Sequence, residues 1–245
     1  MNRIVLTMTT VCILCLTTLL AVPVMASKDA GVVIFLTGKA EVSIDKKSWS
    51  KLVVNNVIFY GTHLRTKKGT RMEIKLGNGS RIRLAPNSQI FLSDPQGRIK
   101  GRKPGMSIQL TVGKIWSKVR ALMGAQDNFE VKTTHAVAGV RGTSFNVAVD
   151  NKGTSVNVFE GKVLVSNKPI YQIKGHTKAN RVPVSGPQMI SKREWNETIA
   201  NAMESIRVGK DGKMSKAMPI PRGKKKRSPW EAWNMKRDKA TEAEF

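Results

Sequence analysis

The sequence predicts an all-β domain followed by a short C-terminal extension that is helical and basic. Polar and apolar residues alternate with period two over most of residues 31–166, which is the pattern of strands with one buried face. Gly, Asn, Pro and Asp interrupt the alternation at short intervals and mark turns. The alternation fades after about Lys168. We therefore expect a signal peptide at 1–26, a β domain at 27–186, and an amphipathic helix with a flexible basic tail at 187–245.

The N-terminal segment has the three parts of a secretory signal. A basic start precedes an apolar run from Ile4 to Leu20, and small residues precede an expected cleavage after Ala26. An uncleaved N-terminal anchor is the alternative, although the run is shorter than the roughly 20 residues that cross a bilayer. Both cysteines, Cys12 and Cys15, lie inside this segment, so the mature chain needs no disulfide. We expect a periplasmic or secreted protein.

Short strands follow one another through the β domain. Residues 71–76 and 81–84 alternate strictly, and the Gly-rich sequence 77–80 between them is typical of a hairpin turn. About a dozen such strands at close spacing predict a sandwich, barrel or solenoid. Residues 69–76 and 142–149 echo each other, since each begins with Gly-Thr and continues as an alternating strand. The echo suggests stacked, β-helix-like or meander layers.

The C-terminal quarter of the chain predicts helices and a linker. Residues 170–190 suggest irregular structure or an edge strand pair. Residues 192–207 follow a capping-box pattern and carry apolar residues at helical spacing, so we expect a helix that packs on the β domain rather than on a membrane surface. Residues 209–228 resemble a flexible basic linker. Ser228 and Pro229 then start a second helix with two tryptophans on one face, which is either a docking helix or a frayed terminus.

The net charge of +25 points to an anionic partner. Export disfavours nucleic acid and leaves an anionic envelope polymer or a membrane surface. Arg81 and Arg83 alternate with apolar residues, so we expect them together on an exposed sheet face. The candidate contacts for an anionic partner are Lys67, Lys68, Arg81, Arg83, Arg98, Lys100, Arg102, Lys103, Lys224, Lys225, Lys226 and Arg227.

The sequence contains no motif that predicts catalysis. Its three histidines do not have metal-ligand spacing, and the nucleophile, phosphate-loop and dinucleotide motifs are absent. Acidic residues are sparse in the β domain, and no pair stands out for acid–base work. We therefore predict no enzymatic activity, no cofactor and no metal.

Several blocks of sequence resemble one known family. They include Leu64-Arg-Thr66, Gly79-Ser-Arg-Ile-Arg-Leu84, Val140-Arg-Gly-Thr-Ser-Phe145 and Phe159-Glu-Gly161. Residues 31–166 are similar to the FecR domain, the periplasmic part of ferric-citrate-type signalling regulators and of stand-alone exported proteins. The resemblance implies an all-β domain and a set of mainly structural motif residues: Gly61, Arg65, Thr66, Gly79, Ser80, Leu84, Gly113, Arg141, Gly142, Thr143, Phe145, Glu160 and Gly161. Arg141 in particular would tie turn carbonyls together rather than bind a ligand.

The signalling members of the family carry a cytoplasmic anti-sigma segment and a membrane span before this domain. Here the expected signal peptide leads directly into the domain, so the resemblance does not imply direct control of a sigma factor. We expect a non-catalytic binding or sensing module that contacts an envelope protein, for example by adding a strand to a sheet edge. Adhesion to an anionic polymer or lipid surface is the alternative, and an uncharacterised enzyme is a third hypothesis.

Overall fold

The computed structural model describes residues 29–93, 106–120, 129–140, 142–167, 171–173, 181–183, 202–221 and 227–242. One helix, α3 (Pro229–Ala240), ends this part of the chain. The strands before it are β1 (Asp29–Thr37), β2 (Ala40–Ser43), β3 (Ser50–Lys51), β4 (Val57–Phe59), β5 (Thr62–Thr66), β6 (Arg71–Leu76), β7 (Arg81–Leu84), β8 (Gln89–Ser93), β9 (Met106–Lys118), β10 (Phe129–Lys132), β11 (Ala136–Val140), β12 (Ser144–Asp150), β13 (Gly153–Glu160), β14 (Val163–Asn167), β15 (Tyr171–Ile173), β16 (Arg181–Pro183), β17 (Glu204–Gly209) and β18 (Met218–Pro219).

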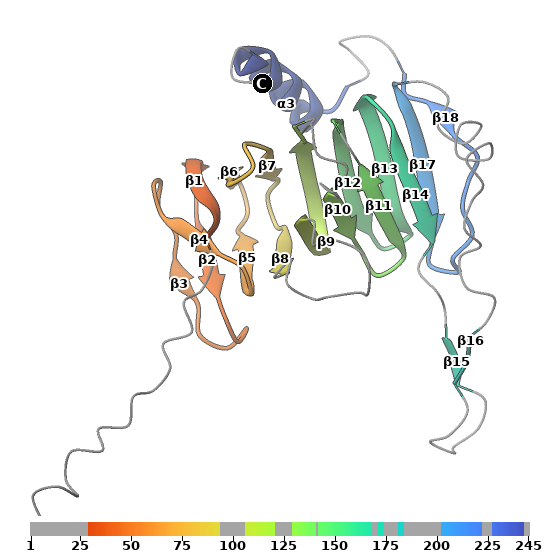
Figure 1. Cartoon of the computed structure of the whole chain (residues 1–245), viewed down its shortest axis with the longest axis horizontal. Coiled ribbons are helices and arrows are strands. Elements are labelled where there is room, and N and C mark those ends of the chain that lie inside the picture. Colours follow the sequence, from red (N-terminus) through yellow and green to blue (C-terminus); the bar gives the residue numbers. More distant parts are fainter. Residues whose placement is uncertain are drawn as a thin grey trace, which may run out of the picture.

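The strands form two layers that share one long strand (Figure 1). Sheet A has the order β18-β17-β13-β12-β9-β7-β6-β1-β4, and sheet B has the order β14-β11-β10-β9-β8-β5-β2-β3. The pairings are antiparallel except for β9 with β10. Strands β15 and β16 pair separately. The all-β prediction with a short C-terminal helix is confirmed.

Strand β9 passes from one sheet to the other at Gly113. Residues 107–112 pair with β8 in sheet B, whereas residues 113–118 pair with β12 in sheet A. Gly113 has a φ of +91°, and a Cβ placed there would lie 2.3 Å from Ser88 Oγ. The Ser88 hydroxyl in turn bonds both the N–H and the carbonyl of Lys114. Only glycine permits this approach, so Gly113 fixes where the two layers join.

The main hydrophobic core lies between the two layers. Ile74, Ile82 and Phe145 enter it from sheet A, and Leu64 and Ile108 enter it from sheet B, all fully buried. Each belongs to an alternating strand, so the period-two pattern predicted the core face. A second, smaller apolar cluster lies on the opposite face of sheet A.

The sequence echo corresponds to a repeated turn contact. Thr70 Oγ1 accepts from the N–H of Lys39 and donates to its carbonyl, each over 2.9 Å. Thr143 Oγ1 donates to the carbonyl of Lys162 over 3.1 Å. Both lysines follow a glycine of positive φ, Gly38 or Gly161, whose missing Cβ makes room for the threonine. In both Gly-Thr turns the threonine hydroxyl therefore donates to the carbonyl of the lysine in a Gly-Lys turn.

The structure corrects two predictions for the C-terminal region. Residues 204–207, expected at the end of a helix, form part of β17, because Ile206 and Val208 alternate with polar residues and are buried against the core. Residues 209–221, expected as a linker, include β18, which pairs with β17. Residues 192–201 and the proposed signal peptide lie outside the described residues.

Candidate functional site: the helix-covered face of sheet A

Helix α3 is defined by its own sequence. Ser228 is its N-cap: the hydroxyl accepts from the N–H of Glu231, and the Glu231 carboxylate accepts from the N–H of Ser228. Pro229 occupies the first helical position, where the lack of an N–H costs nothing. This capping box confirms the predicted helix start. The local sequence therefore determines where the helix begins.

α3 lies across the outer face of sheet A (Figure 1). Its buried residues are Trp230, Asn234 and Asp238, which are spaced four apart and form one stripe. All four residues of β7 and the last four of β9 are buried. A strand is buried on both faces only when both faces are covered. The core covers one face of these strands, and α3 covers the other.

Aromatic rings make up the apolar part of this contact. Trp116 of β9 is fully buried and stacks on Phe159, with centroids 4.4 Å apart. Trp230 of α3 stacks on Trp233 and donates from Nε1 to Asn146 Oδ1 over 3.1 Å. The buried Trp116 therefore forms the floor of the helix contact.

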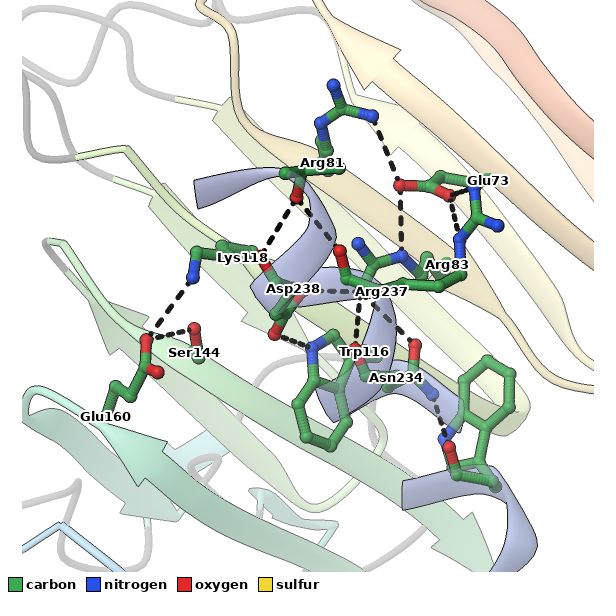
Figure 2. A network of polar contacts seen from close by, with 12 residues as sticks. Glu73, Arg81, Arg83, Trp116, Lys118, Ser144, Glu160, Asn234, Arg237 and Asp238 are labelled. Atoms are coloured by element: carbon green, nitrogen blue, oxygen red, sulfur yellow. Dashed lines mark hydrogen bonds and ion pairs between the residues drawn. The ribbon is translucent and has the colours of Figure 1, made fainter. Parts of the chain in front are cut away.

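A network of buried charges makes up the polar part (Figure 2). Glu73 is fully buried and lies 3.0 Å from Arg83 Nε and 3.4 Å from Arg81 Nη1. Arg237 of α3 reaches the other Glu73 oxygen over 2.5 Å. One carboxylate of sheet A thus contacts three guanidinium groups, one of them brought by the helix.

Asp238 is the helix carboxylate that enters the network. Its Oδ1 lies 2.5 Å from Arg83 Nη1, and its Oδ2 accepts from Trp116 Nε1 over 2.9 Å. Burial raises the pKa of Asp238, and the Arg83 guanidinium opposes this shift. Arg83 Nη2 is buried and has no hydrogen-bond acceptor among the described residues. Asp238 therefore contacts Nη1 of Arg83 and leaves Nη2 without an acceptor.

The network ends at the rim of the helix contact. Lys118 Nζ lies 3.5 Å from Glu160 Oε2, which also accepts from Ser144 Oγ over 2.8 Å. Glu160 is more than half exposed. This rim connects a residue of the family-like motif, Glu160, to the helix-covered face.

The structure places most of the remaining motif residues in turns or in the core. Gly61, Gly79, Gly142 and Gly161 have positive φ, as their turn positions predicted. Leu84 and Phe145 are fully buried. Thr66 Oγ1 donates to the Ala85 carbonyl, and Ser80 Oγ accepts from the N–H of Arg120. Arg65 pairs with Glu41 and stacks over Trp49. Arg141 lies outside the described residues.

The predicted anionic contacts that lie within the described residues do not form one surface. Arg81 and Arg83 are buried, contrary to expectation, because α3 covers the sheet face on which they lie. Lys67 pairs with Glu41, Lys68 is exposed, and Arg227 is half-buried just before α3. The other candidates, Arg98, Lys100, Arg102, Lys103, Lys224, Lys225 and Lys226, lie outside the described residues.

A second feature is the exposed edge of sheet A at β4. This strand ends the order of sheet A and pairs with β1. Val57 and Phe59 of β4 are 43% and 37% exposed, and Val53 and Val54, in the segment that precedes β4, are 48% and 44% exposed. A contact at a sheet edge was expected, but these residues were not among the predicted contacts. Five apolar residues within positions 53–59 were the available signal.

Within the described ranges, no three His, Cys, Asp or Glu side chains gather as a metal site. The same part of the chain holds no helix of the length and apolarity that a bilayer crossing requires.

Among the comparisons with known proteins, the match to a family model supports the sequence resemblance. No curated protein matches the chain. Two crystal structures of a protein from Parabacteroides distasonis ATCC 8503, described as an anti-sigma factor, match with TM-scores of 0.41 and 0.42. Each is 17% identical, and each match covers 64% of this chain and 59% of that one. The model of the FecR protein family matches residues 62–164. Residues 62–164 therefore match the FecR domain that the sequence resemblance indicated.

Proposed function

We propose that the chain is a non-catalytic extracytoplasmic binding or sensing module of the FecR type, and that it contacts an envelope protein in the periplasm or outside the cell. The observation that carries the proposal is the apolar edge at β4. Val57 and Phe59 are exposed on an edge strand, and Val53 and Val54 extend the apolar surface before it. Exposed apolar groups beside open backbone donors and acceptors favour the addition of a partner strand.

The test is a pull-down from solubilised envelope with the full chain, in low salt and in about 0.5 M salt. At 0.5 M the Debye length falls to a few Å, so a contact made through an apolar edge persists while a diffuse charge contact weakens. Val57→Asp should abolish capture of the partner. Leu164→Asp is the matched control, because Leu164 is 41% exposed on β14 at the edge of sheet B.

Equal capture by wild type and by Val57→Asp would overturn the assignment to β4. Loss of capture by both variants would point to a general effect of added negative charge and would also count against β4. Circular dichroism should show that both variants keep the fold, since each side chain is exposed.

The alternative function is adhesion to an anionic envelope polymer or lipid surface. It is favoured by the turns at 38–39 and 67–69, which lie side by side because Lys67 N donates to the Lys39 carbonyl over 2.9 Å. This contact brings the exposed Lys39 and Lys68 to one end of the domain. If the captured envelope material is lost in 0.5 M salt, and is also lost with the double variant Lys39→Ala/Lys68→Ala, adhesion is favoured over the protein contact.

A further inference from the structure

The face of sheet A beneath α3, called the groove below because α3 fills it, combines charged and aromatic side chains. Arg81, Arg83 and Lys118 project into it from β7 and β9, whereas Glu73 and the rim residue Glu160 are its carboxylates. Cations therefore exceed anions on the sheet side. Trp116 supplies an aromatic floor with an indole N–H that needs an acceptor. These groups together suit a ligand with an aromatic ring and a carboxylate.

α3 meets these requirements with residues eight positions apart. Trp230 packs into the aromatic cluster, and Asp238 accepts from both Arg83 and Trp116 (Figure 2). Eight residues of helix span about 12 Å, so two turns connect the apolar and the anionic ends of the groove. The groove thus recognises a helix by one aromatic anchor and one carboxylate.

α3 is an incomplete match for the groove. Arg83 uses Nη1 toward Asp238, and the contacts from Nη1 to Asn234 are long, at 3.4 and 3.5 Å. Arg83 Nη2 is buried and finds no acceptor within the described residues. A carboxylate that engaged both terminal nitrogens of Arg83 would gain a bidentate contact. A ligand from another protein can therefore make a contact that α3 does not make.

We propose that this face of sheet A is a helix-binding site for a partner protein, and that α3 is its built-in, displaceable occupant. The partner segment is an acidic amphipathic helix with an aromatic residue and a carboxylate two turns apart. The excess of cations on the sheet side and the unpaired Nη2 of Arg83 favour a carboxylate at this point and a partner helix more acidic than α3, which carries three bases and two acids. The site is separate from the β4 edge and adds a second, regulated binding surface to the proposed function.

The experiment measures binding of a fluorescent peptide of residues 227–242 to the full chain. Trp230→Ala removes the aromatic anchor of the internal helix and leaves Arg83, Trp116 and Glu73 in place. This variant should bind the peptide at least about tenfold more tightly than wild type, because the internal competitor is weakened. Lys236→Ala changes an exposed residue of α3 and should bind like wild type.

Ser228→Ala offers a second way to weaken α3. It removes the N-cap from a residue that does not contact the groove, and it should increase peptide binding in the same direction as Trp230→Ala. In the double variant Ser228→Ala/Arg83→Ala, the increase in peptide binding should be abolished. A peptide with Glu in place of Asp238 should bind more tightly than the native peptide, since its longer side chain can reach both Arg83 nitrogens.

Equal binding by wild type, Trp230→Ala and Ser228→Ala would overturn the proposal, as would binding that survives Arg83→Ala. A concentration-dependent dimer of wild type in sedimentation, lost in Trp230→Ala, would assign the groove to a second copy and would also overturn it. None of these variants alters Val57, so a negative result here leaves the β4 proposal to its own test.

Discussion

Replacing Asp238 tests whether the buried network holds α3 on the sheet. Asp238 is 4% exposed and pairs with Arg83, which is fully buried. Asp238→Ala leaves Arg83 with the Glu73 carboxylate, which Arg81 and Arg237 already share. Removing one partner of a buried pair costs roughly 3–5 kcal/mol when the other stays buried. At about 2–4 °C per kcal/mol for a domain of this size, Tm should fall by roughly 6–20 °C.

The structure sets an upper limit to this loss. α3 is the last described element of the chain, and it can leave the sheet as a unit and let water reach Arg83. The measured loss then cannot exceed the free energy with which α3 docks. We therefore expect the lower part of the range, together with a release of the helix while the β layers stay folded.

Two measurements separate these effects. Thermal unfolding followed by circular dichroism reports the β layers, and amide hydrogen exchange of residues 229–240 reports helix docking. Lys239→Ala is the control, because Lys239 is the exposed neighbour of Asp238 on α3. A Tm within about 2 °C of wild type, with unchanged protection of 229–240, would refute the view that the charge network holds the helix.

Three further predictions concern the β layers. Gly113→Ala should cost more in urea unfolding than Gly69→Ala: both have positive φ and lose roughly 1–2 kcal/mol from backbone strain, but only at 113 would the new Cβ meet Ser88, at 2.3 Å. Equal losses would contradict this. The hydrogen bond from Arg65 lowers the pKa of Glu41 below its ordinary value of 4.5. The ionised Glu41 carboxylate therefore stabilises the fold above pH 4.5, and this stabilisation is lost as the pH falls through the lowered pKa. The stability difference between wild type and Glu41→Gln should shrink in acid, and a constant difference from pH 3 to 7 would count against it. Thr70→Val should lose roughly 1–3 kcal/mol, because the buried hydroxyl bonds both backbone groups of Lys39, and an unchanged urea midpoint would show that the turn clamp is dispensable.

The β layers were largely predictable because one period-two pattern determines both strand and core face. In β6, Met72, Ile74 and Leu76 are buried as their alternation indicates. The helix start at Ser228 was also predictable, because a capping box is a local signal. Residues 204–207 were mispredicted because Ile206 fits both a helical spacing and an alternation with Val208. Only the partner strand, β13, decides between these two patterns.

The helix-covered face was not predictable, because alternation shows which residues share a face and not what covers that face. Glu73 and Lys75 lie on the same face of β6, yet Glu73 is fully buried and Lys75 is exposed. The difference depends on where α3 crosses the sheet, which is a tertiary property.

One local signal did point toward the contact. Asp238 lies near the C-terminal end of α3, where the helix dipole disfavours a carboxylate, whereas Arg237 and Lys239 beside it suit that end. An acid at this position, four and eight residues after Asn234 and Trp230, indicates that a cation outside the helix compensates it. The domain holds many bases, and the sequence does not reveal which one lies opposite. The burial of Arg83 supplies that answer, and it explains why the helix above this sheet face carries an acid at position 238.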